Sequence, residues 1–293
     1  MYLDDIIIWS DSIEEHEKNV RTILRALKDA KLFVNPKKTK LFCLEVEFLG
    51  HKVSAAGIQA GESKAQAVLD WPRPKSGHEV QQFLGLVQYI AIFLPKLAEH
   101  TWVLNTLTTK ECLKSFPNWT AKHKRAFQGV KDLVVSRECL MVINHDLPGE
   151  NRIFVTTDAS DYCSGAVLSW GTTWETARPV AFDSCMFKGA ELNYLVHEKE
   201  LLAIVRACKK WRSDLLGSSV TVLTDHCTLE NFKTQKDLSH RQARWMELLS
   251  QFDLTIKYLK GKDTCKAPAF FHSLPSVLFP EPSAVFGKRF QVH

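Results

Sequence analysis

The stretch Ile153-Phe154-Val155-Thr156-Thr157-Asp158-Ala159-Ser160 decides the fold of the second half of the chain. It is an apolar, β-branched run followed by an acidic and two small residues, which indicates a buried strand that ends in a turn. The stretch Val220-Thr221-Val222-Leu223-Thr224-Asp225-His226 has the same pattern. Side chains at the carboxyl ends of neighbouring strands occupy the usual ligand position of an open α/β sheet. We therefore expect Asp158 and Asp225 to share a site.

The segments around these two stretches predict a mixed α/β domain with a five-stranded sheet and flanking helices. Hairpin-linked strands come first, and helices alternate with strands later. The predicted strands lie at 153–158, 165–170, 180–183, 220–224 and 252–258, and the predicted helices lie at 191–212, 227–234 and 239–251.

The first half of the chain predicts short strands and then a run of helices that carry few chemical groups. Ser12 is the expected N-cap of the first helix, with Glu15 three residues later. The predicted strands lie at 6–9, 32–34, 46–50 and 52–54, and the predicted helices lie at 13–31, 62–69, 80–94 and 119–134.

Composition narrows the class of protein without deciding it. The chain has 293 residues, 45% hydrophobic and 24% charged, which suits one large or two small globular domains. Its net charge of +5 is compatible with a nucleic-acid partner. The eight cysteines form no CxxC pair, which favours reduced thiols in an intracellular protein, cytoplasmic or nuclear. No apolar segment reaches membrane-spanning length, and the acidic N-terminus does not resemble a secretory signal, so no membrane partner is expected.

A third acid for the site of Asp158 and Asp225 is expected from the helix at 191–212. Glu198 and Glu200 both lie near the edges of its apolar stripe. A helical repeat of about 100° per residue does not separate the two, although they point in different directions. Hard cations such as Mg²⁺ prefer carboxylate oxygens, so three converging acids indicate a site for such ions.

Two further features have a functional and an ordinary interpretation. Adjacent Asp4 and Asp5 can bind divalent cations in a tight turn, but Asp-Asp is also common in hairpin turns without metal. Arg241 and Arg244, three residues apart on one helix face, suit contacts with phosphates, or they form a solvated basic face.

Several short motifs together resemble the polymerase of a gypsy-class LTR retrotransposon, over nearly the whole chain to about residue 275. Tyr2-Leu3-Asp4-Asp5 and Phe48-Leu49-Gly50 resemble a reverse transcriptase palm, and Val80-Gln81-Gln82-Phe83-Leu84-Gly85 with Phe93-Leu94-Pro95 resembles its thumb. The retroelement RNase H signature is matched by Thr157-Asp158-Ala159-Ser160, His197-Glu198-Lys199-Glu200-Leu201-Leu202-Ala203-Ile204-Val205 and Leu223-Thr224-Asp225-His226.

The resemblance implies four regions: a truncated palm at 1–60, a thumb or connection region at 61–147, an RNase H-like domain at 148–275 and a tail at 276–293. It implies that Asp158, Glu200 and Asp225 are catalytic and bind two Mg²⁺ or Mn²⁺ ions, with Asp4 and Asp5 as a remnant polymerase site. Glu200 is preferred to Glu198 because of its place before the Leu-Leu-Ala-Ile-Val run. The implied substrate is an RNA–DNA hybrid.

Two departures from the family pattern alter this expectation. The third palm aspartate would precede residue 1, so we expect a fragment without polymerase activity. The family's Ala-Asp-Ala-Leu-Ser-Arg run reads Ala267-Pro268-Ala269-Phe270-Phe271-His272, so Pro268 replaces the fourth metal-site carboxylate. We therefore expect weak or absent RNase H activity. The alternatives are a catalytically inactive nucleic-acid-binding module and a pseudogene product.

Overall fold

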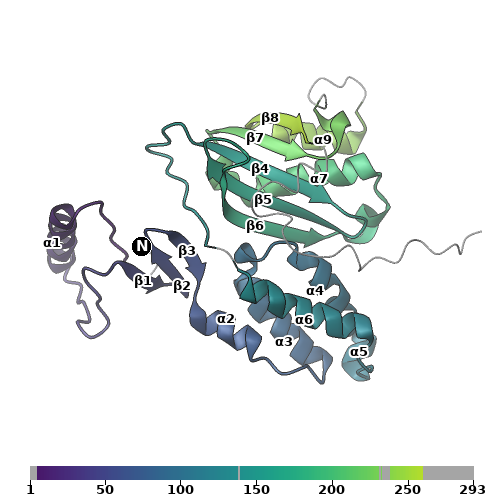
Figure 1. The fold of residues 1–293 in the computed structure, drawn as a ribbon, viewed down its shortest axis with the longest axis horizontal. Helices are drawn as coiled ribbons and strands as arrows, with labels where there is room; N and C mark the ends of the chain where they lie inside the picture. Colours follow the sequence, from purple (N-terminus) through teal and green to yellow (C-terminus); the bar gives the residue numbers. More distant parts are fainter. Residues whose placement is uncertain (1–4, 138, 231, 233–237, 260–293) are drawn as a thin grey trace, which may run out of the picture.

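The computed structural model describes residues 5–137, 139–230, 232 and 238–259. The predictions for Asp4 and Pro268 fall outside these residues. In Figure 1 a five-stranded sheet lies above a group of helices, and α1 lies apart from both.

The sheet has the strand order β6-β5-β4-β7-β8, and it confirms the predicted mixed α/β fold. Strands β4, β5 and β6 form antiparallel pairs, whereas β7 is parallel to both β4 and β8. The strands span Arg152–Ala159 (β4), Cys163–Gly171 (β5), Arg178–Met186 (β6), Ser219–Thr224 (β7) and Asp253–Tyr258 (β8).

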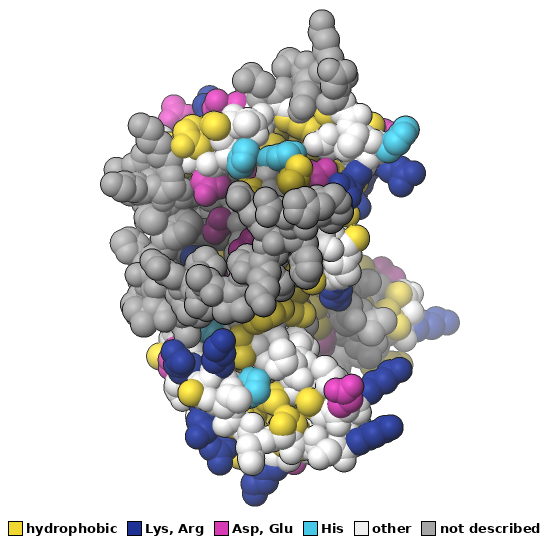
Figure 2. Space-filling model, turned by 90° about the vertical axis from the view of Figure 1, so that its right-hand side faces the viewer, with side chains coloured by type: hydrophobic (Ala, Val, Ile, Leu, Met, Phe, Trp, Pro, Cys, Tyr) yellow, Lys and Arg dark blue, Asp and Glu magenta, His cyan; other side chains and the backbone are white. Residues whose placement is uncertain are grey.

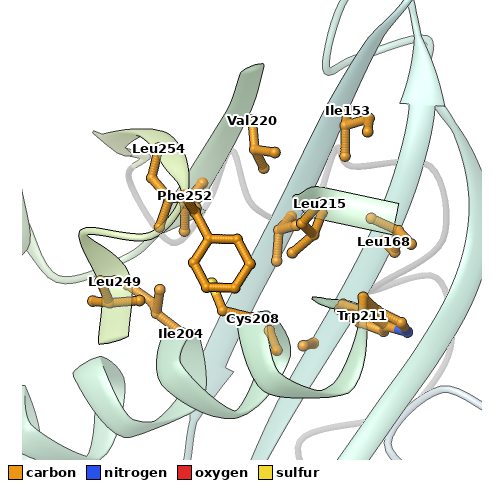
Figure 3. Close-up of a cluster of buried hydrophobic side chains, with 14 of the residues drawn as sticks. Ile153, Leu168, Ile204, Cys208, Trp211, Leu215, Val220, Leu249, Phe252 and Leu254 are labelled. Carbon is orange, nitrogen blue, oxygen red and sulfur yellow. The ribbon is translucent and has the colours of Figure 1, made fainter. Parts of the chain in front are cut away.

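One face of the sheet is covered by α7 (Val196–Lys210), α8 (Arg212–Leu215) and α9 (His240–Leu249). Their apolar side chains meet those of the strands in a single core, in which Phe252 lies between the helices and β7 (Figure 3). Complete burial of one such side chain stabilises a fold by about 1.5–3 kcal/mol. This core fixes α7 against the sheet.

The opposite face of the sheet packs on the helical module, which we define as residues 62–135. Val167 of β5 and Phe182 of β6 are buried in the module's own hydrophobic core. The module consists of α2 (Glu62–Leu69), α3 (Gly77–Tyr89), η1 (Ala91–Phe93), α4 (Leu97–Asn105), η2 (Thr106–Thr108), α5 (Lys110–Lys114) and α6 (Ala121–Val135). The sheet and the module therefore share buried side chains.

The N-terminal segment contains α1 (Ile13–Asp29) and the antiparallel strands β1 (Glu45–Phe48), β2 (His51–Ser54) and β3 (Gly57–Ala60). The Ser12 side chain accepts a hydrogen bond from the Glu15 amide at 3.2 Å, which confirms the predicted N-cap. Leu49 and Gly50 have φ values of 49° and 74°, so they form the two-residue turn that joins β1 to β2.

Some predicted elements are wrong. Residues 6–9 and 32–34 form no strand, because a strand exists through its ladder partners and β propensity alone does not provide them. The helix expected at 80–94 ends at Tyr89 and continues as the 3₁₀ turn η1. The helix expected at 191–212 begins at Val196, after the 3₁₀ turn η3 (Gly189–Asn193), and α4 and α5 were not predicted. Within the predicted helix at 227–234, Cys227–Leu229 forms a 3₁₀ turn (η4), and residues 231 and 233–237 lie outside the described part.

No helix in the described part of the chain has the length and apolar character needed to cross a membrane.

Candidate metal centre

Asp158 and Asp225 are brought together by the parallel pairing of β4 and β7. Asp158 is the last residue but one of β4, and Asp225 directly follows β7. Thr157 lies opposite Thr224 in the ladder, so the residues that follow them leave the sheet side by side. Asp158 is partly buried and Asp225 is exposed, which makes the pair accessible from solvent.

Glu200 of α7 completes a group of three carboxylates. One carboxylate oxygen from each of Asp158, Glu200 and Asp225 lies within 4.8 Å of the other two. The Glu200 side chain is 2% exposed, and its Oε1 accepts a hydrogen bond from the Ala159 amide at 3.0 Å. Its Oε2 is buried without a hydrogen-bond partner.

Glu198 lies on the same helix but faces another partner. Both of its carboxylate oxygens accept hydrogen bonds at 2.8 Å from Nη2 of Arg241. The structure therefore directs Glu200, and not Glu198, toward the two aspartates. The choice between them, which helical periodicity left open, depends on the rotation of α7 about its axis.

The electrostatics of this cluster suit a cation. Burial is the main cause that raises the pKa of Glu200 to about 9, and the negative charges of Asp225 and Asp158 raise it further. Burial and the charge of Asp225 also raise the pKa of Asp158. The raised pKa values of Glu200 and Asp158, together with the buried and unpaired oxygen of Glu200, fit a hard divalent cation, which would reverse these shifts.

Beside the carboxylates lies a group of aromatic and basic side chains. The guanidinium of Arg241 lies 3.8 Å from the ring centroid of Tyr194, and the rings of His197 and His226 are 6.2 Å apart. Arg241 is thus engaged with Glu198 and Tyr194, whereas Arg244 is exposed on the same helix. The two predicted phosphate-contacting arginines therefore differ in their freedom to meet a ligand.

Comparisons with known proteins agree with this architecture. Residues 149–252 match the family described as RNase H-like domain found in reverse transcriptase, and residues 1–53 match reverse transcriptase (RNA-dependent DNA polymerase). The Transposon Tf2-3 and Tf2-7 polyproteins of Schizosaccharomyces pombe are each 35% identical over 264 residues, which is 89% of this chain. The chain belongs to the reverse transcriptase and RNase H family of LTR retrotransposons. It spans 19% of the length of these curated relatives.

Solved structures place this chain in the same fold as a viral protein. The foamy viral protease-reverse transcriptase in complex with ds DNA has a TM-score of 0.74 at 22% identity, covering 89% of this chain and 45% of that one. The same viral protein in complex with an RNA/DNA hybrid has a TM-score of 0.73 at 22% identity, covering 100% of this chain and 38% of that one.

The structure adds two residues to the surroundings of the RNase H-like site that sequence analysis missed. Glu99 and Lys96 lie at the start of α4, near Asp158. The positive charge of Lys96 lowers the pKa of Asp158, and the negative charge of Asp158 raises the pKa of Glu99. Neither belongs to a recognisable motif, because their position depends on how the helical module docks on the sheet. Of the predicted polymerase remnant, Asp5 is exposed, and Asp4 lies outside the described residues.

Proposed function

We propose that the RNase H-like domain of this chain hydrolyses the RNA strand of RNA–DNA hybrids with the aid of Mg²⁺. The observation that supports this proposal is the convergence of Asp158, Glu200 and Asp225 within 4.8 Å, with Oε2 of Glu200 buried and unpaired. Divalent cations, with Mn²⁺ as an alternative to Mg²⁺, activate the attacking water and stabilise the leaving oxygen when they are bound to such a site.

The protein's own contribution is to hold the carboxylates and to position the hybrid. Asp158 and Asp225 are fixed by the ladder of β4 and β7, and Glu200 is fixed by the core beneath α7. The Ala159 amide orients the Glu200 carboxylate through its hydrogen bond to Oε1. Arg244, exposed on α9, is suited to contact phosphates of the hybrid, and Arg241 keeps Glu198 away from the site.

A basic surface on the helical module supports a nucleic-acid partner. Figure 2 shows Lys and Arg side chains around the lower part of the molecule, which is the helical module. Exposed basic residues of α5 and α6 contribute to this charge: Lys110, Lys114, Lys122, Lys124 and Arg125. Such a surface attracts a phosphate backbone. The foamy viral protein of similar fold was solved with an RNA/DNA hybrid and with DNA.

Our division of the chain follows this function. Residues 1–60 correspond to a reverse transcriptase palm, residues 61–147 to a thumb or connection region, residues 148–275 to the RNase H-like domain and residues 276–293 to a tail.

The 293-residue chain itself is expected not to extend a primer, since Asp4 and Asp5 lack a third palm carboxylate from a separate strand. Primer extension on an RNA template by the pure chain would contradict this expectation.

A catalytically inactive hybrid-binding module is the second candidate, and Pro268 is the observation that favours it, since proline offers no ligand oxygen. Cleavage of a labelled RNA–DNA hybrid in Mg²⁺ separates the two candidates. We expect slow cleavage by the wild type and faster cleavage by Pro268→Asp. Asp158→Asn should lose at least about 100-fold in rate, because several kcal/mol of charge stabilisation disappear. Hybrid binding without cleavage in both the wild type and Pro268→Asp would favour the inactive module.

A further inference from the structure

The helical module covers the face of the sheet toward which Asp158 points. Side chains alternate along a strand, and residues opposite each other in a ladder share a face. Val167 and Phe182 lie opposite each other and are buried in the helical module. Two residues further along this face, Gly165 lies opposite both Ser184 and Asp158. Asp158 therefore lies in one row with Gly165 and Ser184, beneath the module.

Helix α4 is anchored on this row by its first turn. The Ala98 amide donates a hydrogen bond to Oγ of Ser184 at 2.9 Å. Glu99 is the next residue of that turn. Ser184 and Asp158 are two strand spacings apart, about 10 Å, and Gly165 between them has no side chain to fill the space. A long acidic side chain from the first turn of α4 can thus extend past Gly165 toward Asp158.

The charges around Glu99 agree with this placement. Burial is the main cause that raises the pKa of Glu99; Lys96 lowers it, and Asp158 raises it. Burial is the main cause that raises the pKa of the Cys163 thiol, and the negative charges of Glu99 and Asp158 raise it further. The charges of Glu99 and Asp158 thus both reach Cys163, in agreement with the face on which the ladder and the anchor of α4 place them.

A partly buried acid near Asp158 requires a physical reason. Its position in the first turn of α4 and the charge of Lys96 favour a negative charge on Glu99, but burial and the repulsion from Asp158 together outweigh them, so the pKa of Glu99 is raised. A hydrated cation in the centre would turn that repulsion into attraction. The buried, unpaired Oε2 of Glu200 independently indicates that this centre receives a ligand.

We propose that Glu99 is a further carboxylate of the metal centre, accepting hydrogen bonds from water bound to a divalent cation that Asp158, Glu200 and Asp225 hold. This inference rests on the proposed metal-binding function. Groups that orient the ligands and waters of a metal contribute about 10–100-fold to its affinity. The helical module would then take part in metal binding by the RNase H-like domain.

Binding of Mn²⁺ to the full 293-residue chain, followed by electron paramagnetic resonance, tests the proposal without any measurement of cleavage. The isosteric Glu99→Gln variant should bind Mn²⁺ about tenfold more weakly than the wild type. Glu111→Gln is the matched control, because Glu111 is an exposed acid of α5 in the same module. The Mn²⁺ affinity of the Glu111→Gln variant should equal that of the wild type. Asp158→Asn should lose binding more severely than Glu99→Gln.

The outcomes distinguish this inference from the function on which it rests. Equal Mn²⁺ affinity in the wild type, Glu99→Gln and Glu111→Gln, with weak binding only in Asp158→Asn, would overturn the role of Glu99 alone. Equal binding by the wild type and Asp158→Asn would overturn the metal centre and this inference together. Thermal unfolding in a chelator checks that each variant is folded. If Glu99→Gln is not folded, Glu99→Asp replaces it, and wild-type affinity in that shortened variant would overturn the proposal.

Discussion

Two glutamates of α7, two residues apart, differ in what surrounds their carboxylates. Glu200 lies with Asp158 and Asp225, whereas Glu198 is paired with Arg241. We expect Glu200→Gln to abolish Mn²⁺ binding and hybrid cleavage, because it removes a charged ligand. Glu198→Gln should leave metal affinity within about twofold and lower the free energy of unfolding by about 1–3 kcal/mol, through the loss of a charge-assisted pair. Titration with Mn²⁺ and chemical denaturation measure the two effects, and a reversed order would show that Glu198 is the ligand.

The raised pKa of Glu200 predicts how stability depends on pH in the absence of metal. In the folded chain Glu200 holds its proton up to about pH 9, whereas an unfolded chain releases it near 4.5. Between these values unfolding releases a proton, so the free energy of unfolding falls as pH rises, by at most about 1.4 kcal/mol per pH unit from this group. Denaturation in a chelator should show this slope, and Glu200→Gln should make it shallower. Glu198→Gln is the control and should keep the wild-type slope. An unchanged slope in Glu200→Gln would contradict the burial of an uncompensated acid.

The candidate site could be predicted from sequence only in part. Asp158 and Asp225 each follow an apolar β-branched run, so local sequence alone suggests that they end neighbouring strands. The role of Glu200 depends on the rotation of α7 against the sheet, and periodicity did not resolve it. Glu99 was not predicted, because it reaches the site through the docking of a distant element.

At the scale of elements, helices and strands were predicted correctly where the local sequence pattern of a segment is enough to indicate its secondary structure. Helix α2 was predicted at the observed bounds, and the five strands of the sheet were predicted in their order along the chain. Helix α5 was missed because it is short, and α4 was missed because its four polar residues stand among apolar ones without clear amphipathic spacing. The segment 6–9 has strong β propensity but forms no ladder in the described part of the structure.

The attachment of α4 to β6 leads to a prediction about stability. The Ala98 amide belongs to the first turn of α4 and has no partner within that helix, so Oγ of Ser184 satisfies it. Ser184→Ala should lower the free energy of unfolding by about 1–3 kcal/mol, since a buried donor loses its acceptor. Ser213→Ala removes an exposed hydroxyl and should change stability by less than about 0.5 kcal/mol. Equal effects of the two substitutions in urea denaturation would show that this hydrogen bond does not hold α4.

At the scale of the whole molecule, the parts differ in how much they bury. The sheet and the helical module each contribute many fully buried apolar side chains, whereas Val20 is the one buried residue of α1. Large apolar side chains near α1 are exposed, including Trp9 at 79% and Phe33 at 100%. The residues around α1 therefore gain little from their own packing, and the sheet with its module carries the stability of the described chain.

The shared core predicts that the helical module and the sheet unfold together. Phe182 belongs to β6 but is 2% exposed within the core of the module. Phe182→Ala should lower the free energy of unfolding by about 3–5 kcal/mol, because it leaves a cavity at the junction. Amide hydrogen exchange should rise in α4 and α6 as well as in β5 and β6, since the cavity weakens both sides of the interface. Leu216→Ala, at an exposed leucine after α8, is the control and should leave exchange in the module unchanged. Faster exchange confined to β5 and β6 would mean that the module is stable without the sheet, and that α4 reaches the metal centre as an independent unit.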